Sequence, residues 1–223
     1  MVLSVRKSSL AVLMSMVIFI AVNAYAQNAD EALMLLREGN TRFAAMKMRH
    51  PNVSAERRVD TAVGGQNPFA AVLACSDSRE PVEVIFDRGI GDIFVVRVAG
   101  NIATDPSVIG SIEYAAEHLG TSLIIVMGHT ECGAVKAAIS GPPLCGDIRA
   151  IQKTIEVVAV KVKKYQPALR GDELLHAVVK ENVFQAIEDI LSNSEEIKHM
   201  VREGKLKILP AVYNLKTGAV EWL

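Results

Sequence analysis

The chain has 223 residues, of which 50% are hydrophobic and 22% are charged. This length and composition suit one globular domain with a substantial core. The formal net charge of −1 gives no electrostatic reason to expect a nucleic-acid partner.

The first 26 residues have the pattern of a secretory signal peptide. Arg6 and Lys7 form a basic start, and residues 10–22 form an apolar stretch that is too short to span a bilayer comfortably. Residues 24–26 match a small-x-small cleavage site. We therefore expect cleavage after Ala26, a periplasmic or secreted protein, a single domain over residues 27–223 and no stable membrane span within it. An uncleaved N-terminal anchor is the alternative.

Helices and strands are expected to alternate along the rest of the chain. Residues 30–48 have a helical apolar pattern that is interrupted near Gly39-Asn40, and residues 57–67 form a polar loop. Apolar, β-branched runs predict strands at 69–74, 92–98, 122–127, 206–213 and 219–223. Helices are predicted at 81–86, 106–119, 131–140, 151–162, 174–191 and 195–203. This order predicts an α/β fold, with a mainly parallel central β-sheet flanked by helices and an antiparallel C-terminal edge strand.

Two polar loops at predicted strand ends contain the candidate catalytic and metal-binding residues. Cys75, Asp77 and Arg79 follow the first strand at alternate positions, and His129 and Cys132 follow the third strand. Ligands bind beyond the carboxyl ends of strands in open parallel sheets, so these loops can meet in space. Two cysteines, one histidine and one aspartate form a tetrahedral zinc set.

Other readings of these residues remain open from the sequence alone. Cys75 and Cys132 can be small buried hydrophobes, with His129 a hydrogen-bonded core residue. An exported chain with three cysteines can also pair Cys132 with Cys145 in a disulfide. A zinc or thiol protein without catalytic activity is a further alternative, although no C-x-x-C motif is present.

Six segments of the chain resemble the β-class carbonic anhydrases, and together they span most of the chain after residue 30. They are Cys75–Arg79, Val96–Asn101, Gly110–Ala115, Gly128–Ala134, Glu181–Val183 and Val212–Gly218. This combination is far more specific than a metal-ligand pattern alone. Together with the predicted signal peptide, these segments make the chain similar to an exported bacterial β-class carbonic anhydrase.

The resemblance implies one Zn²⁺ per subunit, bound by Cys75, His129 and Cys132, with Asp77 or water in the fourth position. Arg79 would compete for Asp77, so that the site is open when Arg79 holds the carboxylate and shut when Asp77 binds zinc. The implied activity is reversible hydration of carbon dioxide to bicarbonate and a proton by zinc-bound hydroxide. Asp77 and Arg79 would be the catalytic residues.

The resemblance also implies a substrate pocket formed by Gln66, Phe94, Tyr114 and the Gly133 backbone. Such pockets lie at a subunit interface in this family, so a homodimer or homotetramer is expected. Core packing or a turn is the other explanation for these four residues. Some relatives hydrolyse carbon disulfide or carbonyl sulfide instead, and pocket access rather than sequence decides between these substrates.

Overall fold

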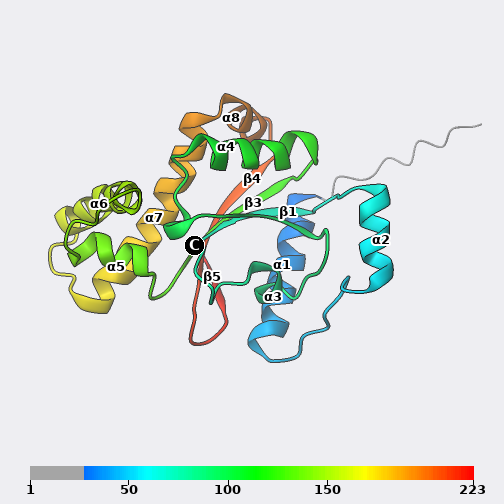
Figure 1. Ribbon diagram of the computed structural model, residues 1–223, viewed down its shortest axis with the longest axis horizontal. Coiled ribbons are helices and arrows are strands. Elements are labelled where there is room, and N and C mark those ends of the chain that lie inside the picture. Colours follow the sequence, from blue (N-terminus) through cyan, green and yellow to red (C-terminus); the bar gives the residue numbers. More distant parts are fainter. Residues whose placement is uncertain (1–27) are drawn as a thin grey trace, which may run out of the picture.

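The computed structural model describes residues 28–223, so the predicted signal peptide lies outside the described residues (Figure 1). A five-stranded sheet in the order β2-β1-β3-β4-β5 forms the centre of the molecule. The strands are β1 Ala70–Ala74, β2 Ile93–Arg97, β3 Leu123–His129, β4 Lys207–Tyr213 and β5 Val220–Trp222. The first four are parallel, and β5 pairs with β4 in the antiparallel direction. The predicted fold class is therefore confirmed.

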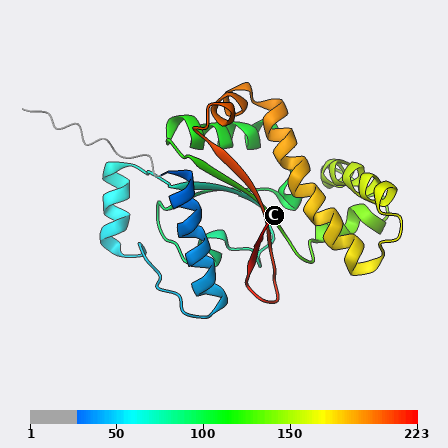
Figure 2. The same cartoon turned by 180° about the vertical axis from the view of Figure 1, so that it is seen from behind.

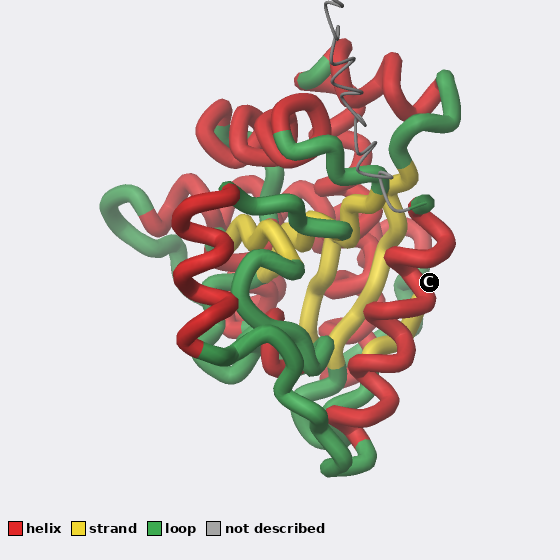
Figure 3. Tube along the Cα trace, turned by 90° about the vertical axis from the view of Figure 1, so that its right-hand side faces the viewer, coloured by secondary structure: helices red, strands yellow, loops and turns green. Residues whose placement is uncertain are grey.

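Helices cover both faces of this sheet (Figures 2 and 3). The α-helices are α1 Ala29–Ala44, α2 Ala55–Gly64, α3 Val82–Ile85, α4 Pro106–Glu113, α5 Gly133–Ser140, α6 Ile148–Tyr165, α7 Gly171–Asn193 and α8 Glu195–Arg202. A short 3₁₀ turn, η1 (Ala99–Asn101), follows β2, and a π-helical turn, η2 (Tyr114–His118), extends α4. Residues of α1 and α3 share one apolar cluster, and those of α4, α6, α7 and α8 share the other.

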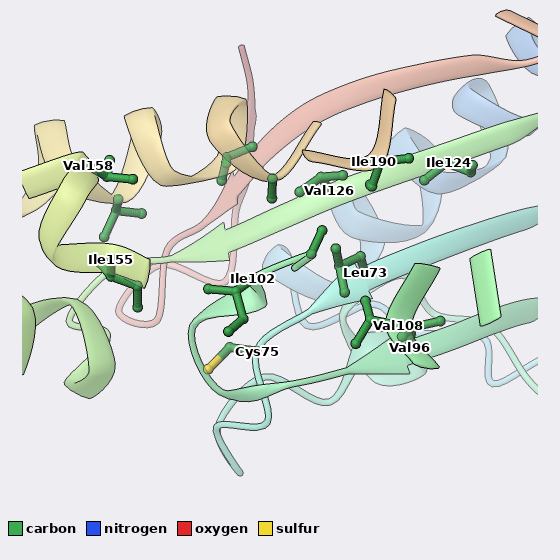
Figure 4. Close-up of a cluster of buried hydrophobic side chains, with 14 of the residues drawn as sticks. Leu73, Cys75, Val96, Ile102, Val108, Ile124, Val126, Ile155, Val158 and Ile190 are labelled. Atoms are coloured by element: carbon green, nitrogen blue, oxygen red, sulfur yellow. The ribbon is translucent and has the colours of Figure 1, made fainter. Parts of the chain in front are cut away.

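The two apolar clusters lie on opposite faces of the sheet because side chains alternate along each strand. Ala71, Leu73 and Cys75 belong to the cluster under α4 and α7. The intervening residues of β1 belong to the cluster under α1 and α3. Both faces of β1 and β3 are buried, as is typical of parallel strands in α/β proteins. Cys75 stands at the margin of its cluster, just beyond the end of β1 (Figure 4).

The expected interruption of the first helix is wrong, because α1 continues through Gly39 and Asn40. A Cβ atom at position 39 would lie 1.8 Å from the Phe86 carbonyl oxygen, so glycine lets α1 pack directly against the end of α3. The buried Asn40 side chain donates to the Gly218 carbonyl and accepts from the Val220 N–H. Both residues that resemble a helix break therefore serve tertiary packing.

The polar loop expected over residues 57–67 is also wrong, because α2 occupies most of that stretch. The Ser54 hydroxyl oxygen accepts the Arg57 N–H and caps the helix. Ala55, Val59, Ala62 and Val63 recur at helical spacing, but no residue of α2 is buried, so this short apolar stripe does not pack against the rest of the described chain. Among residues 28–223, none of the helices combines the length and the apolar character needed to cross a bilayer.

Candidate metal centre

Three potential metal ligands come together at the carboxyl edge of the sheet. Cys75 follows the last residue of β1, and His129 is the last residue of β3, which pairs with β1. Cys132 stands immediately before α5. The sulfur atoms of Cys75 and Cys132 and a ring nitrogen of His129 all lie within 4.8 Å of one another, and all three residues are buried. The two loops that the sequence analysis expected to meet do meet.

His129 presents one ring nitrogen that is ready to bind a metal. Its Nδ1 lies 2.9 Å from the Thr130 carbonyl oxygen. A carbonyl oxygen only accepts, so Nδ1 carries the proton and Nε2 keeps its lone pair. Nε2 is buried and has no hydrogen-bond partner among the described residues. A buried polar atom without a partner is costly, and a metal ion in the cluster would remove that cost.

The two sulfurs also fit a dication. The hydrogen bond with Cys132 lowers the pKa of Cys75, and the neighbouring His129 ring and the Gly100 N–H lower it further against the opposing effect of burial. The neighbouring Cys75 sulfur and burial raise the pKa of Cys132. The pair therefore loses one proton readily and resists losing the second. A divalent cation between the sulfurs offsets that repulsion, and two thiolates with one imidazole are ligands that Zn²⁺ favours.

The turn η1 donates a backbone hydrogen bond to the Cys75 sulfur. The Gly100 N–H donates to Cys75 Sγ at 3.2 Å, and Asn182 of α7 donates to the Gly100 carbonyl at 2.8 Å. Gly100 has a φ of 74°, in the left-handed region that favours glycine. A Cβ atom there would lie 2.6 Å from Cδ1 of Ile155. Glycine at this position therefore lets the backbone approach the sulfur.

Asp77 and Arg79 form a two-pronged ion pair beside the cluster. Arg79 donates from Nε to Oδ1 of Asp77 at 2.9 Å and from Nη2 to Oδ2 at 2.7 Å. The Arg79 backbone N–H also donates to Oδ1, at 3.0 Å. The Arg79 side chain holds the pKa of Asp77 well below its usual range, so this carboxyl is ionised. Asp77 Oδ2 lies 3.8 Å from His129 Nε2, close to the cluster but outside it.

A family model described as carbonic anhydrase matches residues 70–220, which is more than half of the chain and includes every residue of the cluster. The chain belongs to the β-carbonic anhydrase family. Carbonic anhydrase 2 of Mycobacterium tuberculosis is 36% identical over 195 residues, which cover 86% of this chain and 91% of that protein. The carbonic anhydrase of Mycolicibacterium smegmatis is 37% identical over 198 residues, which cover 87% and 93%.

Solved structures agree with this membership in the β-carbonic anhydrase family. A structure of a tetrameric β-carbonic anhydrase from the ascomycete Sordaria macrospora aligns with a TM-score of 0.70 and 26% identity. The alignment covers 83% of this chain and 93% of the Sordaria macrospora chain. The Coccomyxa β-carbonic anhydrase in complex with acetazolamide aligns with a TM-score of 0.69 and 25% identity, and covers 88% of this chain and 86% of its own.

One of the four residues expected around the substrate lies next to the cluster. Gly133 follows Cys132 and lines an almost wholly apolar pocket of about 220 Å³. Ala99 of η1 lines the same pocket, next to the glycine whose N–H bonds the Cys75 sulfur. No metal ligand lines this pocket, but two of its lining residues are neighbours in sequence of Cys132 and of Gly100, which bonds the Cys75 sulfur.

The other three residues lie toward the opposite end of the sheet in the same chain. Gln66 precedes β1, and with Tyr114 it lines a pocket that contains no member of the metal cluster. Phe94 is near the start of β2, with its ring centroid 6.1 Å from that of Tyr114. The five residues of β1, which span about 16 Å at 3.3 Å per residue, separate Gln66 from Cys75.

Glu80 is a buried residue at the site that was not predicted from the sequence. Its side chain accepts the Cys75 N–H at 2.9 Å, and the residue has no exposed surface. Burial raises the pKa of Glu80 to about 8. An acid in a polar loop is normally solvated, and nothing in the sequence distinguishes this one from its exposed neighbour Glu83.

Proposed function

We propose that the chain catalyses the reversible hydration of carbon dioxide to bicarbonate and a proton, with Cys75, His129 and Cys132 holding one Zn²⁺. The observation that carries this proposal is the buried cluster with its unpaired His129 Nε2, in a member of the β-carbonic anhydrase family. Zn²⁺ bound there would supply a Lewis acid that lowers the pKa of bound water to about 7, so that hydroxide forms near neutral pH.

Asp77 is placed to orient the reacting water. Its carboxylate is ionised, and Oδ2 faces the cluster at 3.8 Å from His129 Nε2. An ionised carboxylate only accepts hydrogen bonds, so Asp77 would accept one from a water at the metal and thereby orient that water. Arg79 donates to both carboxylate oxygens, and this pairing would keep Asp77 from binding a metal ion in the cluster.

The pair also provides a way to shut the site. If Arg79 releases Asp77, the carboxylate is near enough to the cluster to bind the metal in place of water. Arg79 is largely exposed, and the Glu131 carbonyl at 3.4 Å is its other hydrogen-bond acceptor. Both arrangements use the same residues, so Asp77 acts as a ligand only in the closed one.

A nonpolar substrate needs an apolar wall beside the metal. The pocket next to Gly133 supplies one in the same chain, because its lining is almost free of polar atoms. Gln66, Phe94 and Tyr114 would complete the pocket from a second copy of the chain, since they lie at the far end of their own sheet. The Sordaria macrospora relative is tetrameric, which supports a homodimer or homotetramer here.

The proposed setting is the periplasm or the exterior of a bacterial cell. The basic start, apolar stretch and small-x-small site over residues 1–26 support export and cleavage after Ala26. Residues 27–223 would then form the single mature domain. Cell fractionation and N-terminal sequencing test this, with Gln27 expected as the first residue of the exported form.

Stopped-flow measurement of carbon dioxide hydration, with zinc analysis of the same samples, tests the activity. We expect one zinc per subunit, loss of zinc in Cys75→Ala, and retained zinc with at least a 100-fold lower kcat in Asp77→Asn. Cys145→Ser, at an exposed cysteine, is the control and should match the unmodified protein. Hydration at full rate in both site variants would refute the assignment. Hydrolysis of carbonyl sulfide without carbon dioxide hydration would favour the other family activity.

A further inference from the structure

The backbone groups of Cys75 leave the sheet ladder and need other partners. The last bond of the ladder beside this residue runs from the Val98 N–H to the Ala74 carbonyl, at 3.1 Å. The next peptide group toward the metal centre is that of Cys75, which is buried. Buried backbone groups are almost always hydrogen-bonded, so two side chains take over from the ladder here.

Those two side chains come from Glu80 and Arg97. Glu80 accepts the Cys75 N–H at 2.9 Å. Arg97, the last residue of β2, donates from Nε to the Cys75 carbonyl at 3.0 Å and from Nη2 to the Asp77 carbonyl at 2.6 Å. The Glu80 backbone N–H also donates to the Asp77 carbonyl, at 3.0 Å. Hydrogen bonds therefore fix the N–H of Cys75 and the carbonyl groups of Cys75 and Asp77, in the segment that joins the Cys75 sulfur to the Asp77 carboxylate.

Glu80 is a costly residue for a purely structural contact. The residue is fully buried, and its Oε1 has no hydrogen-bond partner among the described residues. A well-packed apolar side chain would avoid the desolvation of a carboxyl group. It would also leave the Cys75 N–H without an acceptor and free that peptide to rotate.

We propose that Glu80 and Arg97 are positioning residues that clamp the Cys75 peptide, so that the first sulfur and the Asp77 carboxylate are set for the metal before it binds. Neither side chain belongs to the ligand cluster, so both act through the backbone of Cys75 and Asp77. The gain is preorganisation, because a ligand that is already oriented loses less conformational freedom on binding. This inference rests on the proposed zinc site.

Zinc affinity, measured by chelator competition, is the direct test. Glu80→Leu removes the acceptor and should weaken zinc binding 10- to 100-fold, the usual effect of losing a residue that supports a metal ligand. Glu80→Gln keeps an oxygen that can accept the Cys75 N–H and should stay within about threefold of the unmodified protein. Hydrogen exchange in the zinc-free protein should show a fast Cys75 amide in Glu80→Leu and a slow one in Glu80→Gln.

Asp87→Ala is the matched control. Asp87 is also a buried acid that accepts backbone N–H groups, those of Arg49 and His50, but it touches no member of the metal cluster. Its loss should lower the unfolding temperature and leave zinc affinity unchanged. If Glu80→Leu behaves in the same way, Glu80 only stabilises the fold and the clamp is refuted.

A second variant, Arg97→Met, tests the same proposal if Glu80→Leu does not fold. Arg97 is exposed, so its replacement should not prevent folding. It should weaken zinc binding at least 10-fold, and unchanged affinity would overturn the clamp. An unmodified protein that binds no zinc would instead refute the proposed function. The two failures are therefore distinguishable.

Discussion

The three cysteines lie in two different environments, and this difference decides their chemistry. Cys75 and Cys132 are buried beside each other, whereas Cys145 is exposed in the segment before α6. All three are free thiols, so the disulfide between Cys132 and Cys145 that the sequence left open does not form in this structure. Thiol reactivity follows exposure and thiolate character, and a bound metal shields the ligands that hold it.

Thiol titration with a chromogenic disulfide reagent should therefore depend on the metal. The zinc-loaded protein should react at one thiol, Cys145, and a strong chelator should raise the count to three. In Cys145→Ser, the zinc-loaded protein should give no fast reaction. Three reactive thiols before chelation would mean that Cys75 and Cys132 do not hold the metal.

The ion pair between Asp87 and Arg42 makes the free energy of unfolding depend on pH in the acid range. Burial alone would raise the pKa of Asp87, but the Arg42 side chain and the backbone N–H groups of Arg49 and His50 outweigh it and lower the pKa below 3.8. Arg42 Nε lies 2.6 Å from Oδ2 of Asp87. The folded state therefore binds a proton at Asp87 less readily than the unfolded state does.

Because this folded-state pKa is lowered, the stabilisation by Asp87 is fully present above the unfolded-state pKa of about 3.9. It is lost as the pH falls through the lower pKa of the folded state. Asp87→Asn should cost about 2 kcal/mol in the free energy of unfolding at pH 7, and this difference should shrink as the pH falls below the unfolded-state pKa. Urea unfolding of both proteins at several pH values measures it, and a difference that grows on acidification would contradict the assignment.

At the scale of elements, the packing of α1 on α3 depends on a close backbone approach. Gly39→Ala would place a methyl group 1.8 Å from the Phe86 carbonyl oxygen, so the two helices must separate. We expect a loss of about 2–3 kcal/mol in the free energy of unfolding. Gly64→Ala in α2 is the control, because nothing lies within 4 Å of the added Cβ, and it should be neutral or stabilise slightly. Equal effects in denaturant titrations would show that α1 and α3 do not pack this closely.

The helix α2 shows how a helix can form from a sequence whose apolar pattern is too weak to predict it. Its Ser54 cap and helix-compatible residues are local features, but its apolar residues remain exposed, including 61% of Val59 and 86% of Val63. The apolar residues of α2 do recur at helical spacing, but they are few, and the charged residues and glycines of residues 57–67 favoured a loop.

At the scale of the whole molecule, the metal cluster lies at one end of the sheet, and three of the four predicted pocket residues, Gln66, Phe94 and Tyr114, lie toward the other end. A complete site would then need two copies of the chain, each supplying one part. Mixing experiments test this, because two inactive variants can complement each other only when the site is shared between subunits.

Asp77→Asn and Gln66→Ala should each have low activity alone. Refolded together in equal amounts, they should recover about a quarter of the unmodified activity, since half the dimers are mixed and each mixed dimer has one intact site. Mass measurement in solution should show a dimer or tetramer. A monomer with full activity, or no recovery on mixing, would place the whole site within one chain.

The sequence by itself determined the order of the strands and of every α-helix except α2, the parallel sheet with its C-terminal hairpin, and the three residues that could cluster as ligands. These features depend on apolar periodicity, turn residues and adjacent motifs, which are local along the chain. The two loops could be expected to meet because parallel strands place their carboxyl ends at one edge of the sheet.

Only the tertiary structure decided which residues are buried against which neighbours. It turned Gly39 and Asn40 from an apparent helix break into a packing contact, and it made Glu80 a partner of the Cys75 peptide. It also separated Gln66 and Tyr114 from the metal cluster. The physical reason is that burial and hydrogen-bond partners depend on contacts between distant segments, and the residue types alone do not specify those contacts.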